Sequence, residues 1–157
     1  MDDEKLRTLN RLIMDAIAEE IGAIIGDPLD LRWPPEVTLA SICNCLAFLS
    51  RLSDENISNY AGIVASSHKG GSDEEVRKFQ ERWGVARPLP PHDDSRVLHV
   101  ERVCQEALRI PHELYRRPVH LQMAAYCLMA GLLARYRGDE PSTVVDRVTA
   151  TVPLSPV

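Results

Sequence analysis

Aromatic residues are scarce in this sequence, at 5% of its 157 residues, and the apolar residues are mainly Leu, Ile, Val and Ala. Strands favour aromatic and β-branched side chains, so this composition suits helix packing better than a sheet. The length is that of one domain and is sufficient to close a hydrophobic core. These observations favour an all-α, single-domain protein.

Long hydrophobic runs are also absent. The most apolar stretch, residues 123–134, is shorter than the ~20 residues that a membrane-spanning helix needs. The chain opens on Met1-Asp2-Asp3-Glu4, whereas a secretory signal peptide opens with positive charge. We therefore expect no membrane partner and a cytoplasmic location, or the host cytoplasm if the gene is viral.

The sequence has no excess of basic residues: the net charge is -5 and the pI is about 5.5. General nucleic-acid binding draws most of its affinity from a basic face. Nucleic acid is therefore not an expected partner, whereas a basic protein surface is compatible with this charge.

Metal-binding and catalytic motifs are incomplete. The four cysteines, at positions 43, 45, 104 and 127, lack the paired C-x2-C spacing of a zinc site, and we predict small buried side chains without disulfides. His112-Glu113 begins a zinc-protease pattern, but Arg116 stands where the second histidine belongs. No Gly-x-Ser-x-Gly or Walker loop is present. We predict a non-enzymatic protein without a cofactor.

Hydrophobic periodicity predicts a bundle of six or seven helices with a four-helix core. Residues 3–25 form a long amphipathic pattern, and the nearly uncharged segments 36–52 and 118–137 are expected at the buried centre. The other expected helices cover residues 54–66, 73–83, 94–110 and a short last helix to about 148, in a domain 1–148 followed by a flexible tail 149–157.

The two ends of the chain are organised alike. Segments 3–52 and 94–137 each contain an amphipathic helix, a proline-containing break and an apolar helix. Either two helical hairpins have arisen by duplication, or two amphipathic patterns agree by chance. A proline-rich linker at residues 85–93 precedes the second unit.

A helix containing Asp15-Ala16-Ile17-Ala18-Glu19-Glu20-Ile21-Gly22 resembles the E-E-x-G-E helix of the MazG-like all-α nucleotide pyrophosphohydrolases. The resemblance implies nucleotide binding or cleavage and a Mg²⁺ site that includes Asp15, Glu19 and Glu20. Ala23 stands where the family has a third acid, and Thr38 and Ser41 stand where it has a second acidic pair. These departures imply that a protein of this ancestry has lost the metal site.

Four side chains are candidates for contact with a protein partner. Trp33 and Trp83 lie at expected helix ends, and Arg116-Arg117 form part of a basic cluster. Each tryptophan could instead cover the core, and the arginines could be ordinary solvated charge. The amphipathic segments 3–25 and 94–110 are also compatible with a homodimer seam. We predict a small protein-interaction or regulatory protein, such as a phage-encoded accessory factor, with a diverged MazG-like nucleotide-binding protein as the alternative.

Overall fold

The computed structural model describes residues 2–109 and 118–156, and the described residues form helices without strands, which confirms the all-α prediction. The α-helices are α1 (Asp3–Ile25), α2 (Pro35–Ser53), α3 (Ala61–His68), α4 (Asp73–Trp83), α5 (Ser95–Arg109), α6 (Val119–Arg137) and α7 (Pro141–Thr151). The 3-10 helices are η1 (Pro28–Asp30), η2 (Ile57–Tyr60) and η3 (Val152–Leu154). None of the described helices is long and apolar enough to span a membrane.

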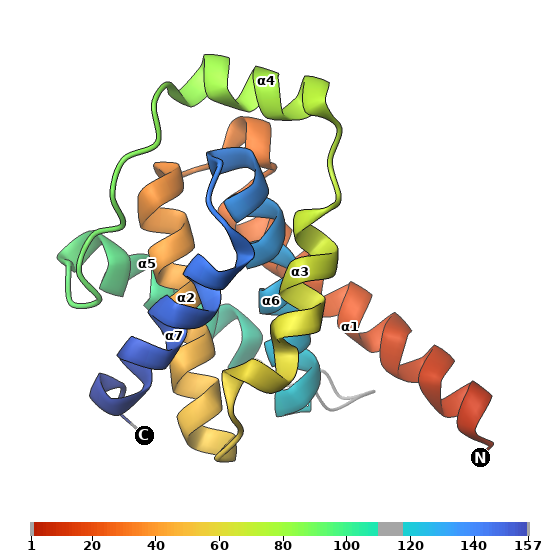
Figure 1. Ribbon diagram of the computed structural model, residues 1–157. Helices are drawn as coiled ribbons and strands as arrows, with labels where there is room; N and C mark the ends of the chain where they lie inside the picture. Colours follow the sequence, from red (N-terminus) through yellow and green to blue (C-terminus); the bar gives the residue numbers. More distant parts are fainter. Residues whose placement is uncertain (1, 110–117, 157) are drawn as a thin grey trace.

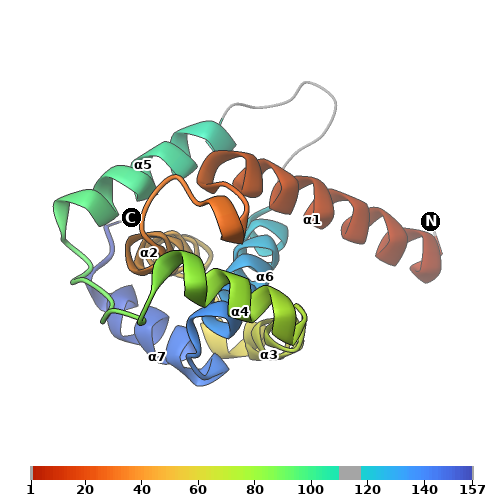
Figure 2. The ribbon, with the colours of Figure 1, turned by 90° about the horizontal axis from the view of Figure 1, so that it is seen from above.

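Helices α2 and α6 form the centre of the bundle, as their nearly uncharged sequences predict (Figure 1). Nearly every side chain of α2 between Val37 and Ser50 is buried, and its two charged residues, Glu36 and Arg51, lie near its ends. Around this pair, α1 and α5 pack on one side, and α3 and α7 on the other (Figure 2). A helix with apolar side chains all round is stable only in such a position.

The approach of α3 to α6 depends on a glycine. A Cβ atom at Gly131 would lie 2.5 Å from the carbonyl oxygen of Val64 and 2.9 Å from Cβ of Ser67. The Ser67 hydroxyl donates a hydrogen bond to the carbonyl oxygen of Leu128 across the same contact. The two helices therefore meet backbone to backbone at a point where any larger residue would separate them.

Helix α4 lies across one end of the bundle (Figures 1 and 2). Its first turn is capped by Ser72, whose hydroxyl oxygen accepts from the Glu75 amide at 3.1 Å. The sequence also predicts that Glu75 reaches back to complete a capping box. Its carboxylate instead accepts a hydrogen bond from the hydroxyl of Tyr136 and so ties α4 to α6.

Two predicted boundaries are wrong. The helix predicted over residues 54–66, with Ser53 as its expected cap, begins only at Ala61, after η2. Ser53 instead ends α2, because Asp54 adopts left-handed backbone angles and its amide closes the last turn. The predicted flexible tail is helical through Leu154, since α7 continues to Thr151 and η3 follows. Thr151 and Ser155 are buried, and the Arg51 guanidinium donates to the carbonyl oxygens of Val152 and Pro153.

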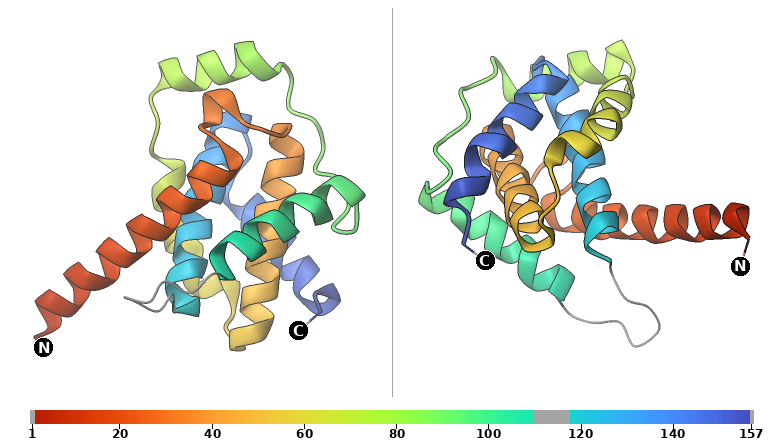
Figure 3. Two further views of the ribbon diagram at one scale, coloured as in Figure 1. Left: turned by 180° about the vertical axis from the view of Figure 1, so that it is seen from behind. Right: turned by 60° about the horizontal axis from the view of Figure 1, so that its bottom comes forward.

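Helix α1 divides into two halves with different environments. Ile17, Ile21 and Ile25 are buried in the bundle, whereas the largely exposed N-terminal half extends away from it in every view (Figure 3). Asp2 caps the projecting end by accepting from the Lys5 amide at 2.8 Å. The helix is thus capped normally at an end that leaves the body of the protein.

Candidate functional site

The projecting half of α1 exposes large apolar side chains. Leu6, Leu9 and Leu12 are 46%, 41% and 62% exposed. Leu6, Leu9 and Ile13 follow the spacing of Ile17 and Ile21, so they continue the stripe that is buried in the second half of the helix. One amphipathic face is therefore covered by the bundle at its C-terminal end and uncovered at its N-terminal end.

The three acids that the MazG resemblance selects lie on the same helix. Asp15 and Glu19 are exposed, and Glu20 is half-buried. Within residues 2–109 and 118–156, no three His, Cys, Asp or Glu side chains are grouped to hold a metal ion. The Mg²⁺ site and the nucleotide hypothesis stay predictions.

Both tryptophans are half-buried against the core. Trp33 meets the ring of His99 edge to face, with the ring centres 6.3 Å apart. Trp83 donates from Nε1 to the carbonyl oxygen of Pro28 at 3.4 Å, and the Arg82 guanidinium lies over its ring at 4.8 Å. Arg116 and Arg117 lie outside the described residues.

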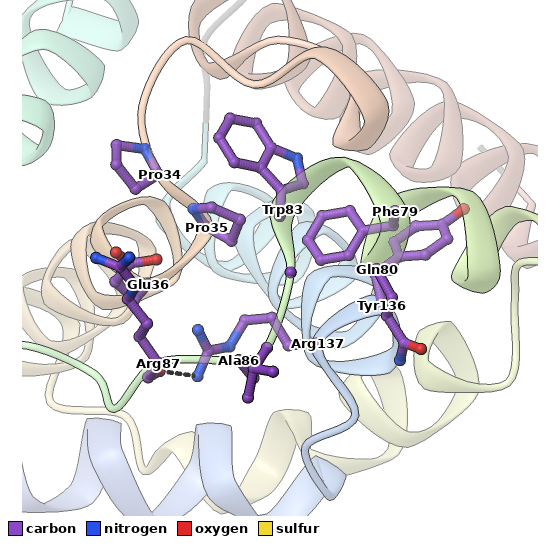
Figure 4. A pocket seen from close by; sticks show the side chains of 12 residues that line it. Pro34, Pro35, Glu36, Phe79, Gln80, Trp83, Ala86, Arg87, Tyr136 and Arg137 are labelled. Carbon is purple, nitrogen blue, oxygen red and sulfur yellow. Dashed lines mark hydrogen bonds between the residues drawn. The ribbon is translucent and has the colours of Figure 1, made fainter.

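A pocket of about 600 Å³ opens beside Trp83, between α4 and the ends of α2 and α6. Figure 4 shows Pro34 and Pro35 facing Trp83 across it, with the Arg137 guanidinium beside Arg87. Phe79 and Tyr136 stack at 5.4 Å between ring centres and form a further part of the wall. The remaining lining residues are Glu36, Gln80, Gly84, Val85 and Ala86.

Arg137 is only 8% exposed, and two of its three guanidinium nitrogens are paired. Nε donates to Oδ2 of Asp139 at 2.8 Å, and one terminal nitrogen, Nη2, donates to the carbonyl oxygen of Arg87 at 2.8 Å. The other, Nη1, is enclosed and has no hydrogen-bond partner among the described residues. An unpaired buried donor on a charged group is costly, because it has lost water without gaining an acceptor.

A second polar cluster joins α2 to α5, and no motif in the sequence predicts it. The Asn44 amide nitrogen donates to the Glu101 carboxylate and to the carbonyl oxygen of His92, each at 2.8 Å, while Gln105 donates to the other Glu101 oxygen. Burial raises the pKa of Glu101 above its ordinary value, although these donors oppose the shift. This cluster lines neither of the pockets described at this protein's surface, and we interpret it as structural.

The four cysteines are buried and unbridged, as predicted. Burial raises the pKa of Cys43 to about 12, and the same cause raises that of Cys127 to about 12. The thiols of Cys43 and Cys127 are therefore neutral at ordinary pH and unsuited to nucleophilic chemistry.

Comparison with known proteins returned no similarity: no family model, no curated protein and no solved structure matches this chain. The candidate sites therefore rest on the geometry of the chain itself, namely the uncovered stripe of α1 and the pocket that contains Arg137.

Proposed function

We propose that the chain is a small interaction protein that assembles as a symmetric dimer through the projecting half of α1. The observation that carries this proposal is the set of partly exposed leucines on a helix that extends beyond the bundle. Burial of a whole leucine stabilises by roughly 1.5–3 kcal/mol, so each half-exposed leucine offers roughly half of that to a partner. We propose a second copy of the chain as the partner that covers this surface.

The apolar positions of the projecting half fit an antiparallel pairing with themselves. Leu6, Leu9, Ile13 and Ala16 occupy the a and d positions of consecutive heptads. In the antiparallel register that joins the most apolar positions, Leu9 packs on Ile13 of the second copy, and Leu6 packs on Ala16. The flanking Leu12, the most exposed of the three leucines, then meets its own counterpart at the twofold axis.

The charges beside the stripe agree with this register. Residues that flank an antiparallel seam on one side face the same flank of the other helix. Lys5 and Glu19 lie on the flank that carries Leu12, at seven-residue intervals from it, and the register places Lys5 opposite Glu19 of the second copy. By symmetry the dimer contains this pair twice. The alternative register, in which Leu6 packs on Leu9, joins fewer apolar residues and no opposite charges.

The association state tests the proposal directly. Sedimentation velocity over a range of protein concentrations should show a reversible monomer–dimer equilibrium, and Leu9→Glu should shift it to monomer. Leu52→Glu is a matched control, because Leu52 is also half-exposed, at 50%, but lies at the end of α2. A monomeric wild-type chain at the highest concentration, or equal effects of the two variants, would contradict the proposal.

A further inference from the structure

We propose that the pocket beside Trp83 binds a carboxylate attached to an aromatic or apolar group. This inference is independent of the dimer, since none of the pocket's lining residues belongs to α1. It begins from Nη1 of Arg137, which is enclosed at the pocket without an acceptor among the described residues.

Arg137 is prepared to receive one more acceptor. Its Nε and Nη2 bonds to Asp139 and to the Arg87 carbonyl hold the plane of the guanidinium fixed, so little side-chain entropy remains to be lost on binding. Arg87, whose carbonyl oxygen contacts Arg137, is an exposed residue of the same pocket, and its side chain can shift to admit a ligand oxygen to Nη1. A hydrogen bond from this charged donor to a carboxylate is stronger than one to a neutral carbonyl.

The charged residues that line the pocket favour a ligand with one negative charge over a ligand with two. Arg137 is already paired with Asp139, and Glu36 contributes a carboxylate to the same pocket as Arg87. A phosphate dianion would add two negative charges beside Glu36, where Nη1 is the one enclosed, unpaired side-chain donor in the described part of the chain. A carboxylate matches that donor with one charge.

The remaining wall is suited to an apolar group attached to that carboxylate. Trp83 and Phe79 present aromatic surface opposite the rings of Pro34 and Pro35 (Figure 4). Val85 is 92% exposed and also lines the pocket, so a bound ligand would cover an apolar side chain that the fold leaves in water. Pockets of this size, apolar with a few fixed polar groups, are typical of small-ligand and peptide-end recognition.

The test uses the fluorescence of Trp83 in full-length chain carrying Trp33→Phe, because these are the only two tryptophans. The probes are 3-phenylpropionate and its uncharged amide. The acid should bind at least about tenfold more tightly than the amide, the difference expected between charge-assisted and neutral hydrogen bonds. Equal affinities for acid and amide, or no binding of the acid, would overturn the proposal.

Two variants locate the site. Val85→Asp adds a negative charge at an exposed position that the fold does not use, and it should weaken acid binding about tenfold while leaving the unfolding midpoint unchanged. Leu154→Asp, at a 59% exposed residue outside the pocket, is the matched control and should bind normally. Arg137→Gln should lose the preference for acid over amide. If Val85→Asp binds the acid like the control, the site is elsewhere and the proposal fails.

Two further probes separate the sources of the carboxylate. A short N-acetylated peptide ending in phenylalanine that binds more tightly than 3-phenylpropionate identifies a protein C-terminus as the ligand, whereas weaker binding identifies a free organic acid. Both results support a carboxylate site. Adenosine monophosphate binding more tightly than every carboxylate would overturn it in favour of a nucleotide site. Leu9→Glu should leave all these affinities unchanged, so failure of the dimer and failure of the pocket remain distinguishable.

Discussion

The contact between α3 and α6 predicts that adding one methyl group at Gly131 lowers the free energy of unfolding. In Gly131→Ala, the new Cβ would lie 2.5 Å from the Val64 carbonyl oxygen, whereas ordinary contacts begin at 3.4 Å. The obstacle is backbone and cannot rotate away, so α3 must move by about 1 Å, at an overpacking cost of about 2–3 kcal/mol. Alanine recovers about 1 kcal/mol through helix propensity, which leaves a net loss of about 1–2 kcal/mol.

Gly62→Ala provides the matched comparison, because Gly62 lies in α3 and a Cβ there would contact nothing within 4 Å. This variant should gain about 0.5 kcal/mol by restricting the unfolded chain. Urea unfolding followed by far-ultraviolet circular dichroism measures both free energies of unfolding. If Gly131→Ala is as stable as Gly62→Ala, α3 and α6 do not meet backbone to backbone at Gly131.

Two further predictions concern the α2–α5 cluster and the first turn of α4. Because burial raises the pKa of Glu101, its protonated form is favoured in the folded state, so its contribution to stability is present below the ordinary pKa and is lost as the pH rises through the raised value. The free energy of unfolding of Glu101→Gln relative to wild type should therefore increase between about pH 4 and pH 7; a constant difference would contradict the assignment. Ser72→Ala should cost about 1 kcal/mol by removing the cap of α4, measured by urea unfolding against Ser142→Ala, an exposed serine in the first turn of α7; equal losses would argue against the cap.

Much of the fold follows from local sequence patterns. The uncharged run from Val37 to Ser50 predicts a buried helix because no other environment suits it, and Ser72 predicts a helix start because its hydroxyl satisfies a free amide. The predictions at Ser53 and Glu75 are wrong because the structure there depends on a backbone conformation and on a distant residue, not on the local pattern. Asp54 adopts a left-handed conformation, and Tyr136, sixty-one residues away, captures the Glu75 carboxylate. Neither competitor is visible in the local pattern.

In the candidate sites, too, some features follow from the local sequence and others depend on contacts between distant residues. Trp83 is recognisable in the sequence as a candidate contact residue, and it lines the pocket. Arg137 is one of two arginines in the last turn of α6. Its importance depends on Arg87 and Asp139 accepting from two of its nitrogens while the third has no partner in the described part of the chain. The periodicity of residues 3–25 predicts an amphipathic helix, but it does not reveal that the bundle covers only half of it.

Charge reversal at the proposed seam of α1 shows whether two copies of the chain associate through this helix. Lys5→Glu alone sets two carboxylates against each other across the seam, and Glu19→Lys alone sets two ammonium groups against each other, so each variant should dissociate at low ionic strength. An equimolar mixture of the two variants restores both opposite-charge pairs, and sedimentation velocity should show a mixed dimer that neither variant forms alone. A mixture that sediments as the sum of its two components would contradict assembly through α1 in the proposed register.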